Sequence, residues 1–367
     1  MNQIPSLVIT GGPCAGKSTG LSRLRDHLAN LGYTVLICPE AATSLITSGI
    51  IPGKTVSGAL FQELVFEKIL TNEAICMKAA KALRRVKPII ICDRGLMDGL
   101  AYTNPEHFEN LCKKFNGSAT LFRDKRYRAV MHLRTAALGA EEFYSLGNND
   151  ARTETPEEAR DLDERTLHAW IGHPHLRVIP NKSDGTFDTK IDHLIEEICH
   201  VLGEPIPLEI ERKFLVKIPD LSTLPHFERV TIVQQYLAPN KTGVRRRIRA
   251  RGQHGSWFYT ETTKRRVTDI TRIETERIIS LREYRHLCAT TLDATRKVIR
   301  KYRYCFVWNH QYFELDVFDK PALHHALLEI ELTREAQEVC LPPFLKIIKE
   351  VSDDPRWTNS ALARRRA

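Results

Sequence analysis

The stretch with the clearest chemical meaning is a glycine-rich octapeptide near the start of the chain. Gly11-Gly12-Pro13-Cys14-Ala15-Gly16-Lys17-Ser18 matches G-x-x-x-x-G-K-[ST], a pattern that binds nucleotide phosphates when it joins a strand to a helix. Glycines let backbone N–H groups curl around phosphate oxygens, and the helix N-terminus adds positive potential. We expect Lys17 to reach the β- and γ-phosphates and act in catalysis. Ser18 is a candidate ligand of Mg²⁺, and Thr19 completes the nucleotide-binding segment.

Three carboxylates near strand ends are candidates for work at the same site. Asp93 ends the apolar run Ile89–Cys92, where it can hold the metal through water and take part in catalysis, or simply cap a helix. Glu40 ends another apolar run, and Asp98 lies just past Asp93. Either could act as a base or support the metal ligands, and salt-bridge roles are equally open.

Two arginines and one short motif complete the candidates in this part of the chain. Arg134 and Arg152 flank a segment that resembles a lid, and one could touch a transferred phosphoryl group; an exposed arginine is more often only solvated. Asn181-Lys182-Ser183-Asp184 matches N-K-x-D, a pattern that reads guanine, which makes Asn181 and Asp184 candidate nucleotide ligands. Asp93-Arg94-Gly95 is not the D-x-x-G of regulatory GTPases, so guanine recognition is only one interpretation.

Charged residues recur at alternate positions throughout the second part of the chain. In a strand, residues two apart share one face. The sets that share a face in this way are Glu209, Glu211 and Lys213; Arg245, Arg247 and Arg249; Glu274 and Glu276; Lys301 and Arg303; Glu314 and Asp316; and Glu329 and Glu331. The charged side could be solvated against an apolar core, or the charged sides could converge inside a barrel. Repetition over six strands favours the barrel, where lysines and arginines would hold a polyanion such as triphosphate and carboxylates would hold divalent cations.

The elements that must position these residues change character near residue 203. Before it, apolar strands at 6–10, 33–38, 88–92, 129–133 and 176–179 alternate with helical segments, which predicts a parallel sheet with flanking helices. Thr155-Pro156-Glu157-Glu158 should start one of these helices with a capping box. After Gly203–Pro207, period-two runs predict an antiparallel barrel. We therefore predict a nucleotide-binding domain over 1–203, a barrel over 207–340 and a terminal helix or tail over 341–367.

Composition and charge narrow the possible partners and the compartment. Residues 1–200 carry 24 basic and 24 acidic residues, so the net charge of +9 lies entirely in residues 201–367 and points to an anionic ligand there. No apolar run reaches membrane-spanning length, and the first residues do not resemble a secretory signal. Nine scattered cysteines without C-x-x-C disfavour a disulfide framework and structural zinc, so we expect a cytoplasmic protein.

The two parts resemble two known families. The matching pieces in the first part are the octapeptide, Pro39-Glu40, Asp93-Arg94-Gly95 with Asp98, and Asn181. With these residues, the first part resembles the P-loop family that includes bacterial nicotinamide-riboside kinases. The second part begins with E-x-E-x-K at 209–213 and ends with E-x-E at 329–331. With these motifs it resembles the CYTH domains, or triphosphate tunnel metalloenzymes. The intervening order also fits: Arg-x-Arg, Lys264, Arg272-x-Glu274-x-Glu276, Lys301-x-Arg303 and Glu314-x-Asp316. In this order the two parts resemble the TRPL translocation defect family.

The resemblance to the tunnel enzymes implies roles for the charged residues. Mg²⁺ or Mn²⁺ would be bound by Glu209, Glu211, Glu329 and Glu331, with Glu274, Glu276, Glu314 and Asp316 as further candidates. Phosphates would be held by Lys213, Arg247, Arg249, Lys264, Lys301 and Arg303, with Arg245 and Arg272 as further candidates. Arg245 shares the alternation of Arg247 and Arg249, so the sequence does not decide which two of the three arginines enter the tunnel. Asp316 could position the water that attacks, and Lys213 is a catalytic candidate.

Three functions are open at this point. The first is a metal-dependent phosphohydrolase that cleaves inorganic or nucleoside triphosphate in the tunnel, with ATP or GTP at the P-loop. The second is a GTP-binding regulatory or trafficking protein whose basic barrel binds an anionic phospholipid or a partner. The third is a small-molecule kinase, which rests on the P-loop alone. The basic residues lie on barrel faces rather than in an aromatic-interleaved patch, which argues against nucleic acid as a partner.

Overall fold

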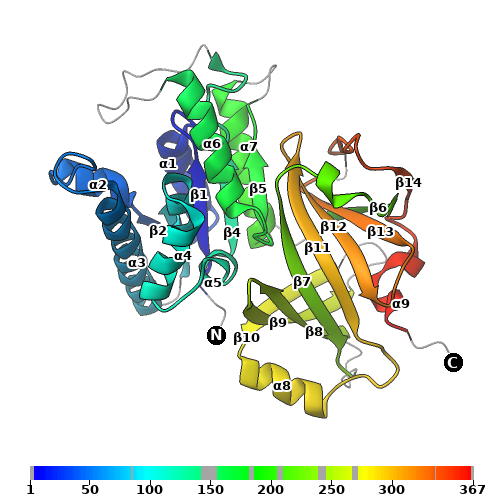
Figure 1. Cartoon of the computed structure of the whole chain (residues 1–367). Helices are drawn as coiled ribbons and strands as arrows, with labels where there is room; N and C mark the ends of the chain where they lie inside the picture. Colours follow the sequence, from blue (N-terminus) through cyan, green and yellow to red (C-terminus); the bar gives the residue numbers. More distant parts are fainter. Residues whose placement is uncertain are drawn as a thin grey trace. The chain divides into compact units, whose positions relative to one another are not determined.

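The computed structural model describes residues 4–83, 86–141, 155–181, 186–204, 210–238, 245–266, 272–334 and 336–364. The chain folds into two compact units, Met1–Ile198 and Cys199–Ala367, which are treated separately below (Figure 1). No helix in the described part of the chain is both long and apolar enough to cross a membrane.

The first unit is built on a five-stranded parallel sheet with the order β2-β3-β1-β4-β5. Its strands are β1 (Ser6–Gly11), β2 (Tyr33–Cys38), β3 (Lys87–Asp93), β4 (Ala129–Leu133) and β5 (Leu176–Ile179). The apolar side chains of β1, β3 and β4 are almost fully buried, as expected for a parallel sheet that is covered on both faces. Because β1 lies between β3 and β4, the carboxyl ends of these three strands meet at one edge of the sheet.

Helices connect these strands and pack on the sheet (Figure 1). They are α1 (Lys17–Asn30), α2 (Ala41–Thr47), α3 (Gly58–Ala82), the 3₁₀ helix η1 (Leu96–Tyr102), α4 (Pro105–Lys114), α5 (Ala119–Asp124), α6 (Pro156–Trp170) and α7 (Phe187–Leu202). The predicted capping box at the start of α6 is confirmed. The Thr155 hydroxyl accepts from the Glu158 amide, and the Glu158 carboxylate accepts from the Thr155 amide.

The second unit is a nine-stranded antiparallel sheet with the order β10-β9-β8-β7-β11-β12-β13-β6-β14. Its strands are β6 (Ile210–Lys217), β7 (Phe227–Tyr236), β8 (Arg245–Gln253), β9 (Ser256–Arg266), β10 (Arg272–Ile279), β11 (Ile299–Trp308), β12 (Gln311–Lys320), β13 (His325–Leu332) and β14 (Ile347–Glu350). Its short helices are η3 (Leu221–Thr223), α8 (Leu281–Thr290), η4 (Pro355–Trp357) and α9 (Asn359–Leu362). The predicted fold class, a P-loop α/β domain followed by an antiparallel tunnel-type domain, is confirmed.

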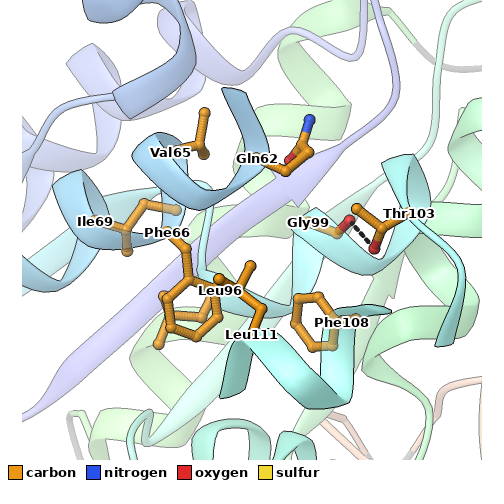
Figure 2. A pocket seen from close by; sticks show the side chains of 9 residues that line it. All are labelled: Gln62, Val65, Phe66, Ile69, Leu96, Gly99, Thr103, Phe108 and Leu111. Atoms are coloured by element: carbon orange, nitrogen blue, oxygen red, sulfur yellow. Dashed lines mark hydrogen bonds between the residues drawn. The ribbon is translucent and has the colours of Figure 1, made fainter. Parts of the chain in front are cut away.

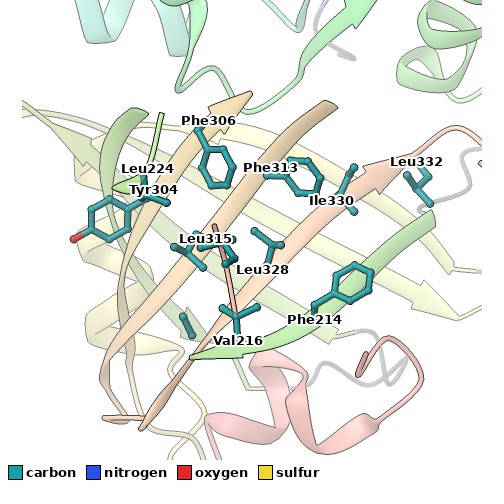
Figure 3. Packing of buried hydrophobic residues seen from close by; sticks show 12 residues of the cluster. Phe214, Val216, Leu224, Tyr304, Phe306, Phe313, Leu315, Leu328, Ile330 and Leu332 are labelled. Carbon is teal, nitrogen blue, oxygen red and sulfur yellow. The ribbon is translucent and has the colours of Figure 1, made fainter. Parts of the chain in front are cut away.

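One face of this antiparallel sheet carries the apolar core. Phe214, Phe306, Phe313, Leu328 and Ile330 lie among its buried members, and Figure 3 shows them interleaved over the strands. These residues occupy one set of alternate positions along β6, β11, β12 and β13. The other set, on the opposite face, holds the charged residues that the sequence singled out. This second face also buries a smaller apolar cluster that includes Leu215 and Phe318. Strand periodicity therefore places the larger apolar core on one face, and the charged residues with the smaller apolar cluster on the other.

Candidate functional site

The loop between β1 and α1 has the backbone geometry that a phosphate-binding loop requires. Gly11 has φ +137°, and a Cβ there would lie 2.0 Å from the Leu133 carbonyl oxygen, so only glycine fits. Gly16 has φ +85° at the residue before α1 and is left-handed. Cys14 is left-handed as well, with φ 54°. The loop thus turns sharply and ends at a helix N-terminus, where backbone N–H groups can face an anion.

Lys17 lies at the first position of α1, and its Nζ donates to the carbonyl oxygens of Gly11 and Gly12, each at 3.1 Å. Burial lowers the pKa of Lys17 to about 8, helped by the Arg94 guanidinium and opposed by nearby carboxylates. A bound phosphate would remove this cost by supplying a counter-charge. The ammonium is therefore held over the loop in the place from which it can reach phosphate oxygens.

Asp93 supplies a polar atom that suits a hydrated metal ion. Its Oδ1 is buried and has no hydrogen-bond partner within the described residues. Burial raises the pKa of Asp93, while the neighbouring Lys17 opposes the change. A buried carboxylate oxygen without a partner is costly unless a ligand completes it. Together with the hydroxyl of Ser18 at the start of α1, Asp93 therefore fits Mg²⁺, which prefers oxygen ligands.

Glu40 and Asp98 are tied into the structure around this site. The Arg94 Nε donates to Glu40 at 2.7 Å, and the pKa of Glu40 is lowered because Arg94 and Lys17 outweigh the effect of burial. Asp98 is buried and accepts from the Thr10 hydroxyl and the Trp170 indole, both at 2.7 Å. Asp98 therefore holds β1 and α6 together, which is a structural role.

Arg134 follows β4 and is turned toward α6. It pairs with Asp163 at 3.1 Å and with Glu164. Asp163 is fully buried and accepts from the backbone amides of Gly12 at 2.7 Å and Thr135 at 3.2 Å. Asp163 thus anchors the phosphate-binding loop from behind. Sequence analysis missed it, although an acidic residue on the apolar stripe of α6, between Ala159 and Trp170, was a readable signal.

Asn181 and a second missed residue, Lys190, fix the other side of the loop. The Asn181 side chain donates to the carbonyls of Thr135 and Leu138, each at 2.7 Å. The Lys190 Nζ donates to Ala15 at 3.0 Å, to the Arg134 carbonyl at 2.6 Å and to the Asn181 side chain at 2.8 Å. Burial lowers the pKa of Lys190 to about 7. The guanine-reading hypothesis stays a prediction, because Asp184, like Arg152, lies outside the described residues.

The first unit also has a small cavity, which lies between α3, η1 and α4. Figure 2 shows Phe66, Phe108 and Leu111 around it, with Gln62 and Thr103 as its polar lining. Its volume is about 10 Å³, roughly the space that one water molecule needs. It is too small in this structure to hold a substrate.

In the second unit, the strand register brings the predicted charged residues onto one face. Glu329 lies opposite Lys213 on β6 and opposite Glu314 on β12. Asp316 lies opposite Arg303, and Arg303 is opposite Val230 of β7. Glu331 lies opposite Glu211. On β9, Thr262 lies opposite Arg247 of β8 and Glu276 of β10. Two residues along, Lys264 lies opposite Arg245 and Glu274. We call this surface the charged face.

Lys213 and its two carboxylates form the first half of an ion-pair cluster on the charged face. The Lys213 Nζ lies 2.7 Å from Glu211 Oε2 and 3.0 Å from Glu329 Oε1. Burial alone would lower the pKa of Lys213, but the two carboxylates outweigh it, so the pKa is raised. The ammonium therefore bridges β6 and β13 as a fixed positive charge.

Arg303 and Lys301 form the other half of the cluster. The Arg303 guanidinium donates to both oxygens of Asp316 at 2.7 Å, to Glu329 at 2.7 Å and to Glu314. Lys301 pairs with the same Asp316. Lys301 and Asp316 are 0% exposed, Glu329 4% and Arg303 6%. The ionic cluster, as we call it, consists of Lys213, Lys301, Arg303, Glu211, Glu314, Asp316 and Glu329.

The pKa values in the ionic cluster follow from burial and pairing. Burial lowers the pKa of Lys301, and Asp316 only partly offsets it. For Glu329, burial would raise the pKa, but Lys213, Lys301 and Arg303 together hold it well below its usual range. For Arg303, the carboxylates overcome burial and raise the pKa. The centre of the ionic cluster is therefore not a solvated surface, and the pairing of its charges offsets the cost of burying them.

Several other residues share this face. Arg249 donates to Gln234 at 3.3 Å, and Gln234 donates to the Tyr236 hydroxyl at 2.9 Å. Glu276 accepts from Thr262 at 3.0 Å. Sequence analysis missed Gln234 and Tyr236, and also the buried Arg251, although Arg251 continues the alternation of 245–249. For Arg245, Lys264, Arg272 and Glu274 the structure gives the register alone, and Glu209 lies outside the described residues.

Comparisons with known proteins give one family match and several similar solved structures. Among curated proteins, none matches the chain. The crystal structures that are similar to it include one of the hypothetical protein NE1496 and one of the inorganic triphosphatase NE1496. Each has 33% sequence identity, a TM-score of 0.30 and covers 42% of this chain, with 97% and 93% of the other chain matched. Residues 6–186 match the family described as the AAA domain. The N-terminal part of this chain is therefore a P-loop domain of the AAA type.

Proposed function

We propose that this protein is a metal-dependent triphosphatase whose second unit hydrolyses inorganic or nucleoside triphosphate, and whose first unit binds ATP or GTP with Mg²⁺. One observation carries the proposal. Two lysines, an arginine and four carboxylates of the ionic cluster meet on one face of the sheet, with its centre almost fully buried. Burying so many charges costs free energy, so a functional ligand is the best reason for their presence.

Triphosphate fits this face better than a neutral or cationic ligand. Lys213, Lys301 and Arg303 present ammonium groups and a planar fork, the donors that bind phosphate oxygens most strongly. Arg247 and Arg249 lie on the same face, and we extend the set to Arg245, Lys264 and Arg272. The carboxylates exclude a bare polyanion by repulsion, and accept one that arrives with divalent cations.

The metal site of the charged face would use hard oxygen donors. Glu211, Glu329 and Glu331 are neighbours across β6 and β13, and we propose that they hold Mg²⁺ or Mn²⁺ together with Glu209; we add Glu274, Glu276 and Glu314 as candidates. When bound, the cation would neutralise charge on the phosphates. Asp316 accepts from both Lys301 and Arg303, so we propose that it positions these cations toward the substrate. Its role in orienting the attacking water stays a prediction.

The test is phosphate release from tripolyphosphate, ATP and GTP with Mg²⁺ or Mn²⁺. The Lys301→Met variant removes a buried cation of the charged face and should lower release from tripolyphosphate about 100-fold or more, the scale of losing one transition-state charge contact. Lys17→Ala should leave that release unchanged and abolish nucleotide binding at the P-loop. Arg212→Met is the matched control, because Arg212 lies on the opposite face and pairs with Glu350. Release that survives Lys301→Met and vanishes in Lys17→Ala would contradict the proposal.

A further inference from the structure

We propose that Lys213 is a built-in substitute for the divalent cation, and that its exchange from carboxylate to phosphate makes metal and triphosphate bind cooperatively. The inference rests on the proposed function of the charged face. It goes beyond that function, because it states how Glu211 and Glu329 keep a positive partner without ligands and why neither ligand binds the face well alone.

The position of the Lys213 ammonium carries the inference. Its Nζ lies 2.7 Å from Glu211 and 3.0 Å from Glu329, two carboxylates on neighbouring strands. Glu331 lies directly opposite Glu211 in the register. A cation that bridged these carboxylates would have to occupy the space that the ammonium now takes. In keeping with this, no three potential metal ligands among the described residues gather closely enough to hold an ion.

The electrostatics of a buried site explain why the exchange must be concerted. Charges that leave water need partners, and an unpaired buried charge costs several kcal/mol. Without triphosphate, a metal ion would have to displace an ammonium that is tethered beside its carboxylates at high effective concentration, and would leave that ammonium unpaired. With triphosphate present, a phosphate oxygen can accept the ammonium's hydrogen bonds. The carboxylates are then open to the cation, and every charge keeps a partner.

Lys213 can move in this way while Arg303 cannot. Lysine carries a compact charge on a flexible four-carbon stem, and arginine presents a rigid fork. The Arg303 guanidinium is held by Asp316, Glu314 and Glu329 at once. Lys213 has two partners, Glu211 and Glu329, and both are carboxylates that the divalent cation would take over. Arg303 therefore keeps Glu329 in place while Lys213 changes partners.

The experiment measures Mn²⁺ bound to the protein by equilibrium dialysis, in which Mn²⁺ complexed by a free phosphate ligand is equal on both sides of the membrane. All proteins carry Lys17→Ala, which weakens phosphate binding at the P-loop. The partner ligand is a triphosphate with imido bridges, which is not hydrolysed. Three proteins are compared, namely the background, Lys213→Met and the control Arg212→Met, which removes a neighbouring positive charge from the opposite face. Circular dichroism and thermal denaturation check that each is folded, and Lys213→Gln replaces Lys213→Met if that variant is not.

Linkage fixes the expected result. Without the imido-triphosphate, Lys213→Met should bind Mn²⁺ about tenfold tighter than the background, within the usual range of coupling between two ligands. Adding the imido-triphosphate should tighten Mn²⁺ binding by at least that factor in the background and in Arg212→Met, and much less in Lys213→Met. Because linkage is reciprocal, Mn²⁺ should tighten imido-triphosphate binding by the same factor.

Two results would overturn the inference and one would remove its foundation. If the background responds to the imido-triphosphate but Lys213→Met binds Mn²⁺ no tighter, Lys213 is not the substitute cation. If Arg212→Met gains as much affinity as Lys213→Met, general charge is responsible. If no protein binds Mn²⁺ with or without the imido-triphosphate, the proposed metal-dependent function itself fails.

Discussion

At the scale of single residues, the two sites depend on buried ionisable groups whose partners come from distant parts of the chain. Asp163 and Lys190 anchor the phosphate-binding loop, yet neither belongs to the loop motif. The motif and the alternation in the sequence predict Lys17, Asp93, Lys301 and Arg303 as candidates. Asp163 and Lys190 could not be assigned in the same way, because their roles depend on which helix faces which loop in three dimensions.

Lys190 should matter for nucleotide binding although it lies behind the loop. The Lys190→Met substitution removes three donated hydrogen bonds and leaves the buried Ala15, Arg134 and Asn181 oxygens without them. Each unsatisfied buried acceptor costs about 1–3 kcal/mol, so we expect ATP affinity to fall at least tenfold, measured with a fluorescent ATP analogue. Lys54→Met, at an exposed lysine, should leave affinity unchanged. Equal affinities for the two variants would contradict the assigned role.

Glu329 should make the stability of the second unit depend on pH in the acidic range. Its pKa is held well below the usual value despite burial. Its pairing therefore stabilises the fold fully above the unfolded pKa of about 4.3, and this stabilisation is lost as the pH falls through the lower folded pKa. We expect Glu329→Gln to cost about 3–5 kcal/mol at pH 7, the usual cost of breaking a buried ion pair.

The measurement is urea denaturation at several pH values, with the hydrogen exchange of β11 and β12 as the signal that reports unfolding of the second unit. The difference in unfolding free energy between wild type and Glu329→Gln should be constant above pH 5 and shrink at lower pH. A difference that stayed constant down to pH 2 would show that this carboxylate is not held ionised by its neighbours.

At the scale of elements, alternation along the strands was the most informative feature of the sequence. It predicted the charged face of β6, β8, β11, β12 and β13, because strand residues two apart share a face whatever the order of the strands. It could not predict that order, since β7 pairs with β11 and β6 with β13 through contacts distant in sequence. The ion pairs, which need the order, became visible only in the structure.

The turn between β1 and α1 offers a direct test of how one element positions the site. Gly11→Ala would place a Cβ 2.0 Å from the Leu133 carbonyl oxygen, on β4, as well as strain φ. Gly49 also has a positive φ, but its Cβ would meet nothing within 4 Å. Gly49→Ala should therefore lower the free energy of unfolding by only about 1–2 kcal/mol through strain. Gly11→Ala should lower it clearly more and should also abolish nucleotide binding. Thermal denaturation of both variants measures this, and equal losses would contradict the close approach of β1 and β4.

At the scale of the whole molecule, chain charge and fold divide at nearly the same place. The first 200 residues are balanced and the rest carry the net charge of +9, and the structure separates two compact units at residue 198. Under the proposed function, this basic excess would attract a polyanionic ligand from solution. The P-loop needs no such excess, since its phosphates are bound largely by backbone N–H groups and a helix N-terminus.

The most direct test of the account is where a triphosphate binds. Hydrogen–deuterium exchange of the wild type should be measured with Mn²⁺ alone and with Mn²⁺ plus imido-triphosphate. We predict slower exchange in β6, β8 and β11–β13 when the triphosphate is added, whether or not residues 11–19 are also protected. Protection confined to residues 11–19, with the second unit unchanged, would contradict the claim that the charged face is the triphosphate site.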